Sequence, residues 1–225
     1  PIGVTVAVNA GLQKPKAILF DWDNTLVDSW AISFDSLNFT LEEFGQEPWS
    51  MEQTRDRVRK SLRDSFPGLF GDDWKKAADV FYARFDEIHI RQLTPIDGAA
   101  DMLARLASQD LYLAVVSNKR GEYLRKEAQH LGWDRHFSKL VGALDAQNDK
   151  PSVEPVELAL SDSSFTRGQD IWFVGDADID MECAINADLA PVLLRPEAPK
   201  PDEFKDHPPI CHVVDCLTLS NLVGN

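Results

Sequence analysis

The stretch that decides the fold reads Ala17-Ile18-Leu19-Phe20-Asp21-Trp22-Asp23-Asn24-Thr25. Its first four residues form a short continuous apolar run, which is typical of a strand buried on both faces of a parallel sheet. Asp21 and Asp23 follow directly, at the point where the strand would end. Two carboxylates so close together repel each other unless a cation engages both, and Mg²⁺ prefers oxygen ligands of this kind. The stretch therefore predicts a buried strand with a magnesium site at its carboxyl end.

Apolar runs of the same design lie further along the chain. Residues 111–116 lead into Ser117-Asn118, and residues 171–174 lead into Gly175-Asp176. The remaining strand candidates are 191–194 and 210–214. Because helical apolar patterns separate these runs, we predict an α/β fold with a doubly wound, Rossmann-like parallel sheet. Ligands bind beyond the carboxyl ends of such strands, so we expect the polar residues there to converge, with Asp176 as a further metal ligand.

Residues 29–93 interrupt the alternation, because they contain only helical patterns. Apolar residues recur there at helical spacing, and Gly45 is well placed to end the first of these helices. We therefore expect a small all-helical cap inserted into the core. The predicted division is an N-terminal extension at 1–14, an α/β core at 15–28 and 94–225, and the cap at 29–93.

Charge and composition narrow the classes of partner. The 225 residues include 23 basic and 37 acidic side chains, and the formal net charge of −14 disfavours binding to nucleic acid or to an anionic membrane. No stretch reaches the roughly 18 apolar residues of a membrane span. Three widely spaced cysteines favour a reducing compartment, so we expect a cytoplasmic protein. Aromatic residues in the cap leave both a monomer and a cap-mediated dimer open.

Four motifs, in order, resemble those of the haloacid dehalogenase superfamily. The first is Asp21-x-Asp23-x-Thr25, the second is Ser117 after an apolar strand, the third is Lys150-Pro151, and the fourth is Gly175-Asp176-x-x-x-Asp180. A lone Asp-x-Asp is a weak signal, whereas four ordered motifs are a strong one. The resemblance extends from about Lys16 to the C-terminus. The third motif departs from the usual pattern after its Pro, so we expect the start of the helix that follows to be displaced.

The resemblance implies a role for each matching residue. Asp21 would be the nucleophile that takes up a phosphoryl group, and Asp23 the general acid and base, with its backbone carbonyl on the metal. Lys150 would stabilise the nucleophile and the transition state. The expected Mg²⁺ ligands are Asp21, Asp23 and Asp176, with Asp180 in a second shell; the expected phosphate-binding or substrate-binding residues are Ser117, Asn118 and Lys119.

These roles imply a Mg²⁺-dependent phosphatase that acts on a small phosphorylated metabolite, with phosphoglycolate as one candidate. The second carboxylate, Asp23, argues against dehalogenation, since a halide needs no proton on leaving. The alternatives are a phosphomutase or phosphotransferase similar to β-phosphoglucomutase, and a non-catalytic binding module with the same fold.

Three cap arginines bear on the substrate. Arg55, Arg59 and Arg63 recur at intervals of four residues and predict a basic stripe on a helix. Such a stripe would suit a second anionic group of the substrate. The alternative is a solvated face paired with acidic neighbours, as charged runs on helices usually are.

Overall fold

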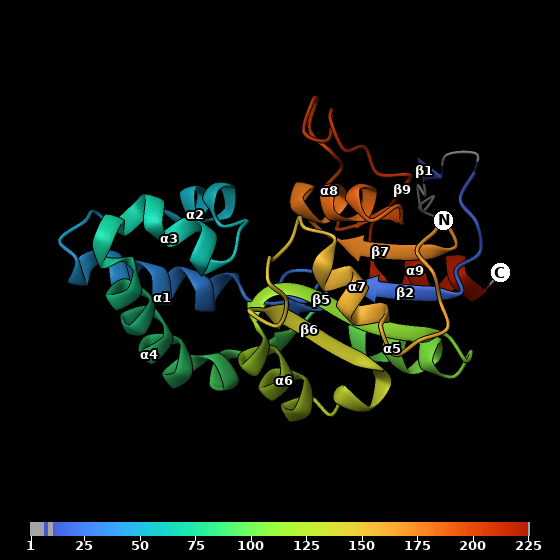
Figure 1. Ribbon diagram of the computed structural model, residues 1–225, viewed down its shortest axis with the longest axis horizontal. Helices are drawn as coiled ribbons and strands as arrows, with labels where there is room; N and C mark the ends of the chain where they lie inside the picture. The colour runs from blue at the N-terminus through green and yellow to red at the C-terminus, as the bar shows by residue number, and fades with distance from the viewer. Residues whose placement is uncertain (1–6, 9–10, 225) are drawn as a thin grey trace. The chain divides into compact units, whose positions relative to one another are not determined.

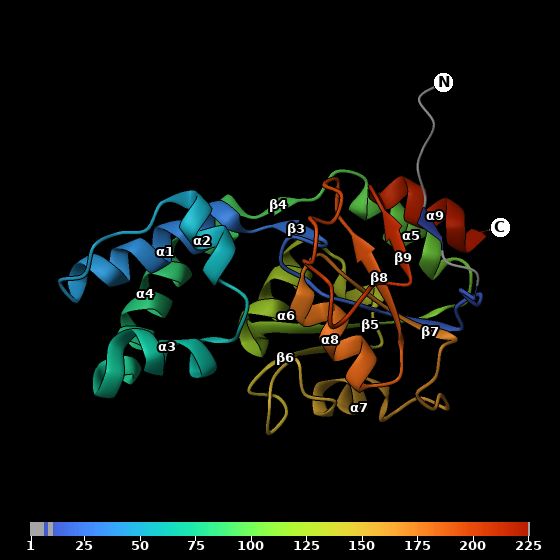
Figure 2. The same ribbon diagram turned by 90° about the horizontal axis from the view of Figure 1, so that it is seen from above.

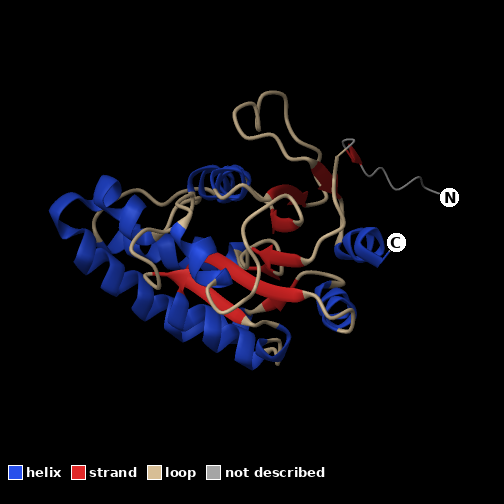
Figure 3. Ribbon diagram, turned by 45° about the vertical axis from the view of Figure 1, so that its right-hand side comes forward, coloured by secondary structure: helices blue, strands red, loops and turns tan. Residues whose placement is uncertain are grey.

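The structure is a computed structural model that describes residues 7–8 and 11–224 (Figure 1). It divides into two compact units, one made of Pro1–Val27 with Pro95–Asn225 and the other of Asp28–Thr94. Figure 3 shows strands gathered in the first unit, whereas the second is built from helices. Each unit is described by itself.

The first unit is built on one sheet with the strand order β1-β9-β8-β7-β2-β5-β6. Its strands are β1 (Ala7–Val8), β2 (Ala17–Phe20), β5 (Tyr112–Arg120), β6 (Lys139–Ala143), β7 (Ile171–Gly175), β8 (Ala190–Leu194) and β9 (Cys211–Val213). The pairs are parallel except β1 with β9, which is antiparallel. The chain builds outward from β2 in one direction, through β5 to β6, and then returns to β7 on the other side of β2. That reversal beside β2 is where α/β sheets bind their ligands.

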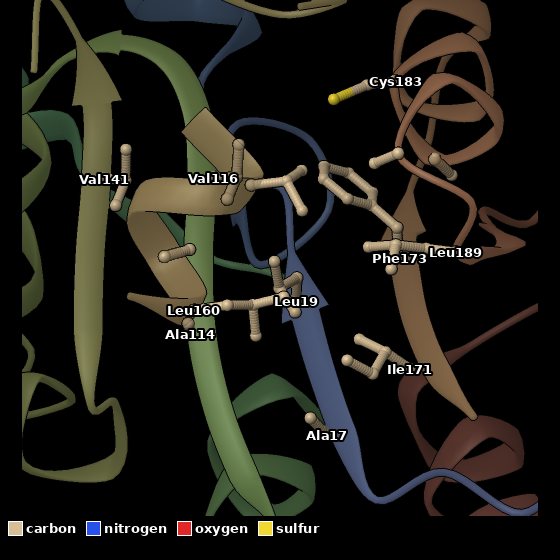
Figure 4. Packing of buried hydrophobic residues seen from close by; sticks show 14 residues of the cluster. Ala17, Leu19, Ala114, Val116, Val141, Leu160, Ile171, Phe173, Cys183 and Leu189 are labelled. Atoms are coloured by element: carbon tan, nitrogen blue, oxygen red, sulfur yellow. The ribbon is translucent and has the colours of Figure 1, made fainter. Parts of the chain in front are cut away.

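Helices cover both faces of this sheet. They are α5 (Ala99–Ala107), α6 (Gly121–His130), α7 (Glu154–Leu160), α8 (Asp178–Asn186) and α9 (Cys216–Gly224). In Figure 2, α5 and α9 lie together on the side of the sheet opposite α7. Alternate strand residues such as Leu19 and Phe173 pack against α7 and α8 in one apolar cluster (Figure 4). The residues between them, such as Ile18 and Val115, are also fully buried, so β2 and β5 are covered on both faces.

The predicted class of fold is confirmed, including the strands expected at 17–20, 111–116, 171–174, 191–194 and 210–214. β6 was missed, because Lys139 and Gly142 interrupt its apolar run. β5 also continues past Val116 to Arg120, with an irregular register against β6 in this part. Of the N-terminal extension predicted at 1–14, residues 1–6 and 9–10 lie outside the described residues.

The second unit contains α1 (Trp30–Glu43), α2 (Met51–Arg57), α3 (Leu62–Phe70) and α4 (Trp74–Gln92), with a 3₁₀ turn at Gly71–Asp73. A two-stranded pair, β3 (Val27–Asp28) with β4 (Thr94–Pro95), lies where the two units meet in sequence. Phe66 and Phe81 pack edge to face, with ring centroids 5.7 Å apart, in an aromatic core. Within the described part of the chain, no helix is both long enough and apolar enough to cross a membrane.

The basic stripe expected on one helix is not formed. α2 ends at Arg57, so Arg55 lies on α2, Arg59 in the connection that follows, and Arg63 on α3. The reason is local, because Val58 and Ser61 both take extended backbone conformations that end one helix and precede the next. The four-residue spacing therefore does not place the three arginines on a single helical face.

Candidate active site

The carboxyl ends of β2, β5 and β7 bring the expected residues together. Phe20 lies opposite Val115 of β5 and Val174 of β7, so β2 and β7 end at nearly the same level, whereas β5 continues to Arg120. The Asp21 amide donates to the Val174 carbonyl at 2.8 Å, which holds the first motif against β7. Asp21 follows β2 directly, and Gly175, the last residue of β7, precedes Asp176. Parallel register therefore delivers both motifs to one edge of the sheet.

Lys150 joins two carboxylates at this edge. Its ammonium lies 2.8 Å from Asp21 Oδ1 and 2.7 Å from Asp180 Oδ1, and its side chain is only 2% exposed. Burial, the largest influence, and the neighbouring Asp180 raise the pKa of Asp21 from 3.8 to about 7, although Lys150 opposes this. Burial also acts to lower the pKa of Lys150, but its attraction to Asp180 and Asp21 outweighs this effect and holds that pKa above its ordinary value. Lys150 is therefore a buried side chain that stays positively charged because it contacts Asp21 and Asp180.

Asp180 has a second contact that fixes its position. Its Oδ2 accepts a hydrogen bond from the Ala177 amide at 3.1 Å, at the start of α8. The same side chain lies against the backbone of Gly175, where an added Cβ would collide with it. A glycine at 175 therefore lets the fourth motif fold back on itself, so that Asp180 reaches Lys150.

Asp176 completes a group of three carboxylates. One oxygen from each of Asp21, Asp176 and Asp180 lies within 4.8 Å of the others. Thr25 Oγ1 donates to Asp176 Oδ1 at 3.2 Å, and Thr25 is 1% exposed. The hydroxyl group of the first motif therefore contacts the acidic residue of the fourth motif.

This group of oxygens fits a hard divalent cation. When all three carboxylates are ionised, they and Lys150 carry three negative charges against one positive, a formal charge of −2 that a dication would balance. Carboxylate oxygens are the ligands that Mg²⁺ prefers. Asp23 was expected to contact the metal through its backbone carbonyl, and its side chain does not belong to this group.

The Asp23 side chain faces another lysine. Lys119 Nζ lies 2.6 Å from Asp23 Oδ1 and 2.7 Å from Glu127 Oε2, and the Lys119 side chain is 6% exposed. Burial alone would lower the pKa of Lys119, but Asp23 and Glu127 outweigh it and raise that pKa, so the ammonium stays charged. The same Glu127 oxygen accepts a hydrogen bond from Trp22 Nε1 at 2.8 Å. Trp22 is fully buried.

Glu127 is the functional candidate that sequence reasoning missed. It lies on α6 with Leu124 and Ala128, and all three are fully buried. Residues at i, i+3 and i+4 share a helix face, so a glutamate at 127 interrupts an apolar face. That charged residue on an otherwise apolar stripe was the signal that could have identified it.

Ser117 and Asn118 lie within β5, and the Asn118 side chain makes hydrogen bonds with the Lys150 backbone. Asn118 Oδ1 accepts from the Lys150 amide at 2.9 Å, and its Nδ2 donates to the Lys150 carbonyl at 3.2 Å. Ser117 is buried, and its Oγ accepts from the Lys119 amide at 3.1 Å. The helix after the third motif begins at Glu154, four residues past Lys150. Asn118 therefore holds the chain that carries Lys150.

Direct phosphate binding by the side chains of Asn118 and Lys119 is not favoured by this geometry. The Asn118 amide group is engaged with the Lys150 backbone, and the Lys119 ammonium lies between two carboxylates. Phosphate binding by Ser117, Asn118 and Lys119 stays a prediction.

The fold and the site define an α/β protein with an acidic cluster beyond its central strands and a lysine buried within that cluster. The chain belongs to the haloacid dehalogenase-like hydrolases, whose family model matches residues 18–193. The resemblance seen in the four motifs is thereby confirmed.

Individual relatives are distant but extend over most of the chain. A pyrophosphatase PpaX from Listeria innocua is 27% identical, over 78% of this chain and 81% of its own length. A phosphoglycolate phosphatase from Chromobacterium violaceum is also 27% identical, over 80% of this chain and 85% of its own. The crystal structure of a predicted phosphoglycolate phosphatase from Haemophilus somnus matches with a TM-score of 0.81 and 22% identity, over 94% of this chain and 99% of its own. At that identity the structural match supports the fold alone.

Proposed function

We propose that this hydrolase is a Mg²⁺-dependent phosphatase that cleaves the phosphate monoester of a small metabolite through an aspartyl phosphate on Asp21. The observation that carries the proposal is the Asp21 carboxylate, which is nearly buried, contacts Lys150 and belongs to a group of three acids. The names of two relatives, a pyrophosphatase and a phosphoglycolate phosphatase, support phosphate chemistry.

In the first half-reaction, a carboxylate oxygen of Asp21 attacks phosphorus and the bond from phosphorus to the ester oxygen breaks. Asp23 gives its proton to the departing alkoxide, so the leaving group departs as an alcohol. In the second half-reaction, Asp23 takes a proton from a water molecule that attacks the same phosphorus. Inorganic phosphate leaves and the Asp21 carboxylate is restored. Lys150, held 2.8 Å from Asp21, offsets negative charge on the nucleophile throughout.

The residues proposed to hold the metal are Asp21 and Asp176 through their side chains and Asp23 through its backbone carbonyl. Asp180 is proposed to hold Lys150 and, when a metal is bound, would orient the water molecules that the metal carries. When bound, Mg²⁺ would neutralise the charge that otherwise keeps a phosphate away from the Asp21 carboxylate. The positive charge of the metal would be needed, because Lys150 and Lys119 each already contact two carboxylates.

For the phosphate itself, we assign the Ser117 hydroxyl and the backbone amides that follow it. The helical unit, Asp28–Thr94, is proposed to be the cap that selects the rest of the substrate. Phosphoglycolate remains the first candidate, and pyrophosphate the second because of the Listeria innocua relative. With pyrophosphate the leaving group is a phosphate, which needs less protonation than an alkoxide.

The test is hydrolysis of p-nitrophenyl phosphate with and without Mg²⁺, followed by a panel of 2-phosphoglycolate, pyrophosphate, hexose phosphates and nucleoside monophosphates. Asp21→Asn is the control for the nucleophile, because it keeps the size of the side chain and removes the attacking oxygen. We expect turnover that needs the metal and is abolished in Asp21→Asn. Turnover without a divalent metal, or an active Asp21→Asn, would refute the mechanism. Transfer of the phosphoryl group to a sugar phosphate rather than to water would identify a phosphomutase or phosphotransferase instead.

A further inference from the structure

The ion pair between Lys119 and Glu127 has no role in the mechanism above. Both side chains are removed from solvent, with 6% of Lys119 and 0% of Glu127 exposed. The lysine lies in β5 and the glutamate in α6, so the pair joins a central strand to the helix that covers it. Removing two charges from water is costly, and an ion pair in such a place is often replaceable by apolar side chains without loss of stability. Helix packing alone therefore gives little reason for this pair.

The pair has one further neighbour, and that neighbour is at the candidate active site. Lys119 Nζ lies 2.6 Å from Asp23 Oδ1, and the Asp23 side chain is 27% exposed, whereas its partners are nearly or fully buried. Glu127 also contacts the first motif, because Trp22 Nε1 donates a hydrogen bond to Glu127 Oε2 at 2.8 Å. Trp22 in turn packs edge to face on Trp133, with ring centroids 5.8 Å apart. A continuous set of buried contacts thus runs from the core to the Asp23 carboxylate.

We propose that Lys119 and Glu127 are positioning residues that hold the Asp23 carboxylate in place for proton transfer. Glu127, fixed by the Trp22 indole, holds one side of the Lys119 ammonium, and the ammonium holds one oxygen of Asp23. The carboxylate then keeps one orientation while its other oxygen meets the leaving group and, later, the attacking water. This inference rests on the proposed function, in which Asp23 is the proton donor and acceptor. It also accounts for a tryptophan between the two aspartates, since a smaller apolar residue could not donate to Glu127.

The competing interpretation is that Lys119 binds the substrate phosphate directly. The two interpretations differ in how a loss of Lys119 depends on the leaving group. A residue that acts through the general acid matters most when the leaving group is a strongly basic alkoxide, and little when it is p-nitrophenolate, which departs without a proton. A residue that binds the phosphate matters equally for both substrates, because the phosphoryl group is the same.

The experiment compares Lys119→Met with Lys126→Met, a matched control on the exposed side of α6. The rate of the first turnover is measured with p-nitrophenyl phosphate and with an alkyl phosphate from the panel, so that the later hydrolysis of the aspartyl phosphate does not limit the reading. We expect Lys119→Met to lose about 10²-fold with the alkyl phosphate and less than about threefold with the aryl phosphate. Inhibition by inorganic phosphate should stay within about twofold of wild type. Equal losses on both substrates, together with weaker inhibition by phosphate, would overturn the proposal in favour of direct binding.

A second variant covers the case in which Lys119→Met does not fold, since that change leaves Glu127 buried without its cation. The double variant Lys119→Met/Glu127→Met removes both charges and should fold as judged by thermal unfolding. It should show the same leaving-group dependence. If it folds and keeps wild-type rates on the alkyl phosphate, the pair does not position Asp23 and the proposal is wrong.

A double-mutant cycle separates this inference from the proposed function. In an Asp23→Asn background, Lys119→Met should cause no further loss, because the group through which it acts is gone. A further tenfold loss in that background would show an independent role and contradict the proposal. If instead Asp21→Asn or Asp23→Asn is itself as active as wild type, the proposed mechanism has failed, and the cycle shows that the fault lies there.

Discussion

Lys150 Nζ donates to Asp21 Oδ1 at 2.8 Å across 129 residues of sequence, and the same ammonium donates to Asp180 Oδ1 at 2.7 Å. The third motif thus reaches the first and the fourth motifs through one buried cation. Asn118 extends this link to the second motif, because its amide group holds the Lys150 backbone on both its N–H and its C=O sides. All four motifs therefore form one hydrogen-bonded set rather than four separate contacts to a substrate.

Lys150→Met should lower kcat by about 10²–10³-fold, the usual cost of removing one charge-stabilising donor from an active site. The stability of the metal-free protein should also fall, because Asp21 and Asp180 are left facing each other without their shared cation. Added Mg²⁺ should recover part of that stability. Steady-state kinetics and thermal unfolding measure both effects, with Lys139→Met, whose ion-pair partner Asp162 is largely exposed, as the control. A Lys150→Met enzyme with wild-type kcat would contradict the role assigned to Lys150.

The raised pKa of Asp21 predicts how the metal-free protein responds to pH. Burial and Asp180 raise that pKa from 3.8 to about 7, so the folded state binds this proton more tightly than the unfolded state does. The corresponding contribution to stability is complete below about pH 4 and is lost as the pH rises through 7. Without metal, the thermal unfolding temperature of the wild type should fall relative to that of Asp21→Asn as the pH rises from 5 to 8. A difference that does not change over this range would show that the pKa of Asp21 is not raised.

Metal binding should depend on the same proton. A cation competes with it for the Asp21 carboxylate, so the affinity for Mg²⁺ should increase as the pH rises towards 7 and level off above that value. Isothermal titration calorimetry in buffers of different ionisation enthalpy measures both the affinity and the proton released. We expect proton release below pH 7 in the wild type. In Lys150→Met the release should extend to higher pH, because Lys150 lowers the pKa of Asp21 and its removal raises that pKa further. Metal binding to the wild type without proton release between pH 5 and 7 would contradict the raised pKa of Asp21.

Much of this fold was predictable because its central strands are buried on both faces. Short continuous apolar runs such as 171–174 are typical of strands buried in a parallel sheet. The polar residues that follow these runs indicate the edge of the sheet where ligands bind. β6 was not predictable in this way, since Lys139 and Gly142 interrupt its run. The arginine spacing in the cap was misleading because backbone conformation at Val58 and Ser61, not side-chain period, decides where α2 ends and α3 begins.

The candidate site residues could be chosen from the sequence, but their partners could not. Thr25 and Asp176, or Lys119 and Asp23, meet only once the strands are paired in register. Residue type indicates which chemistry a side chain can do. Which group it contacts depends on distances that the sequence does not contain, such as those from Asn118 to the Lys150 backbone and from Lys119 to Asp23 and Glu127.

Thr25→Val should weaken metal binding by about tenfold to 100-fold, the usual effect of removing a residue that orients a metal ligand. The Thr25 hydroxyl donates to Asp176 Oδ1 at 3.2 Å, and valine keeps the shape of the side chain without the donor. The Mg²⁺ dependence of activity measures the effect, and saturating metal should restore most of kcat. Thr166→Val, at an exposed position, is the control. If Thr25→Val changed kcat at saturating metal but not the metal dependence, Thr25 would act on something other than Asp176.

Asn118→Ala decides between the role expected from the sequence and the contacts in the structure. The change removes two hydrogen bonds to the Lys150 backbone, at 2.9 and 3.2 Å, and leaves a partly buried amide and carbonyl without these partners. The free energy of unfolding should fall by about 1–3 kcal/mol, the cost of unsatisfied buried polar groups. Because the lysine that this backbone carries would then be less well placed, kcat should fall, whereas KM and inhibition by inorganic phosphate should change little. If Asn118 instead bound the phosphate through its side chain, the variant would keep its stability and lose affinity for inorganic phosphate. Chemical denaturation and phosphate inhibition, measured on the same preparation, separate the two outcomes because each interpretation predicts a change in only one of them.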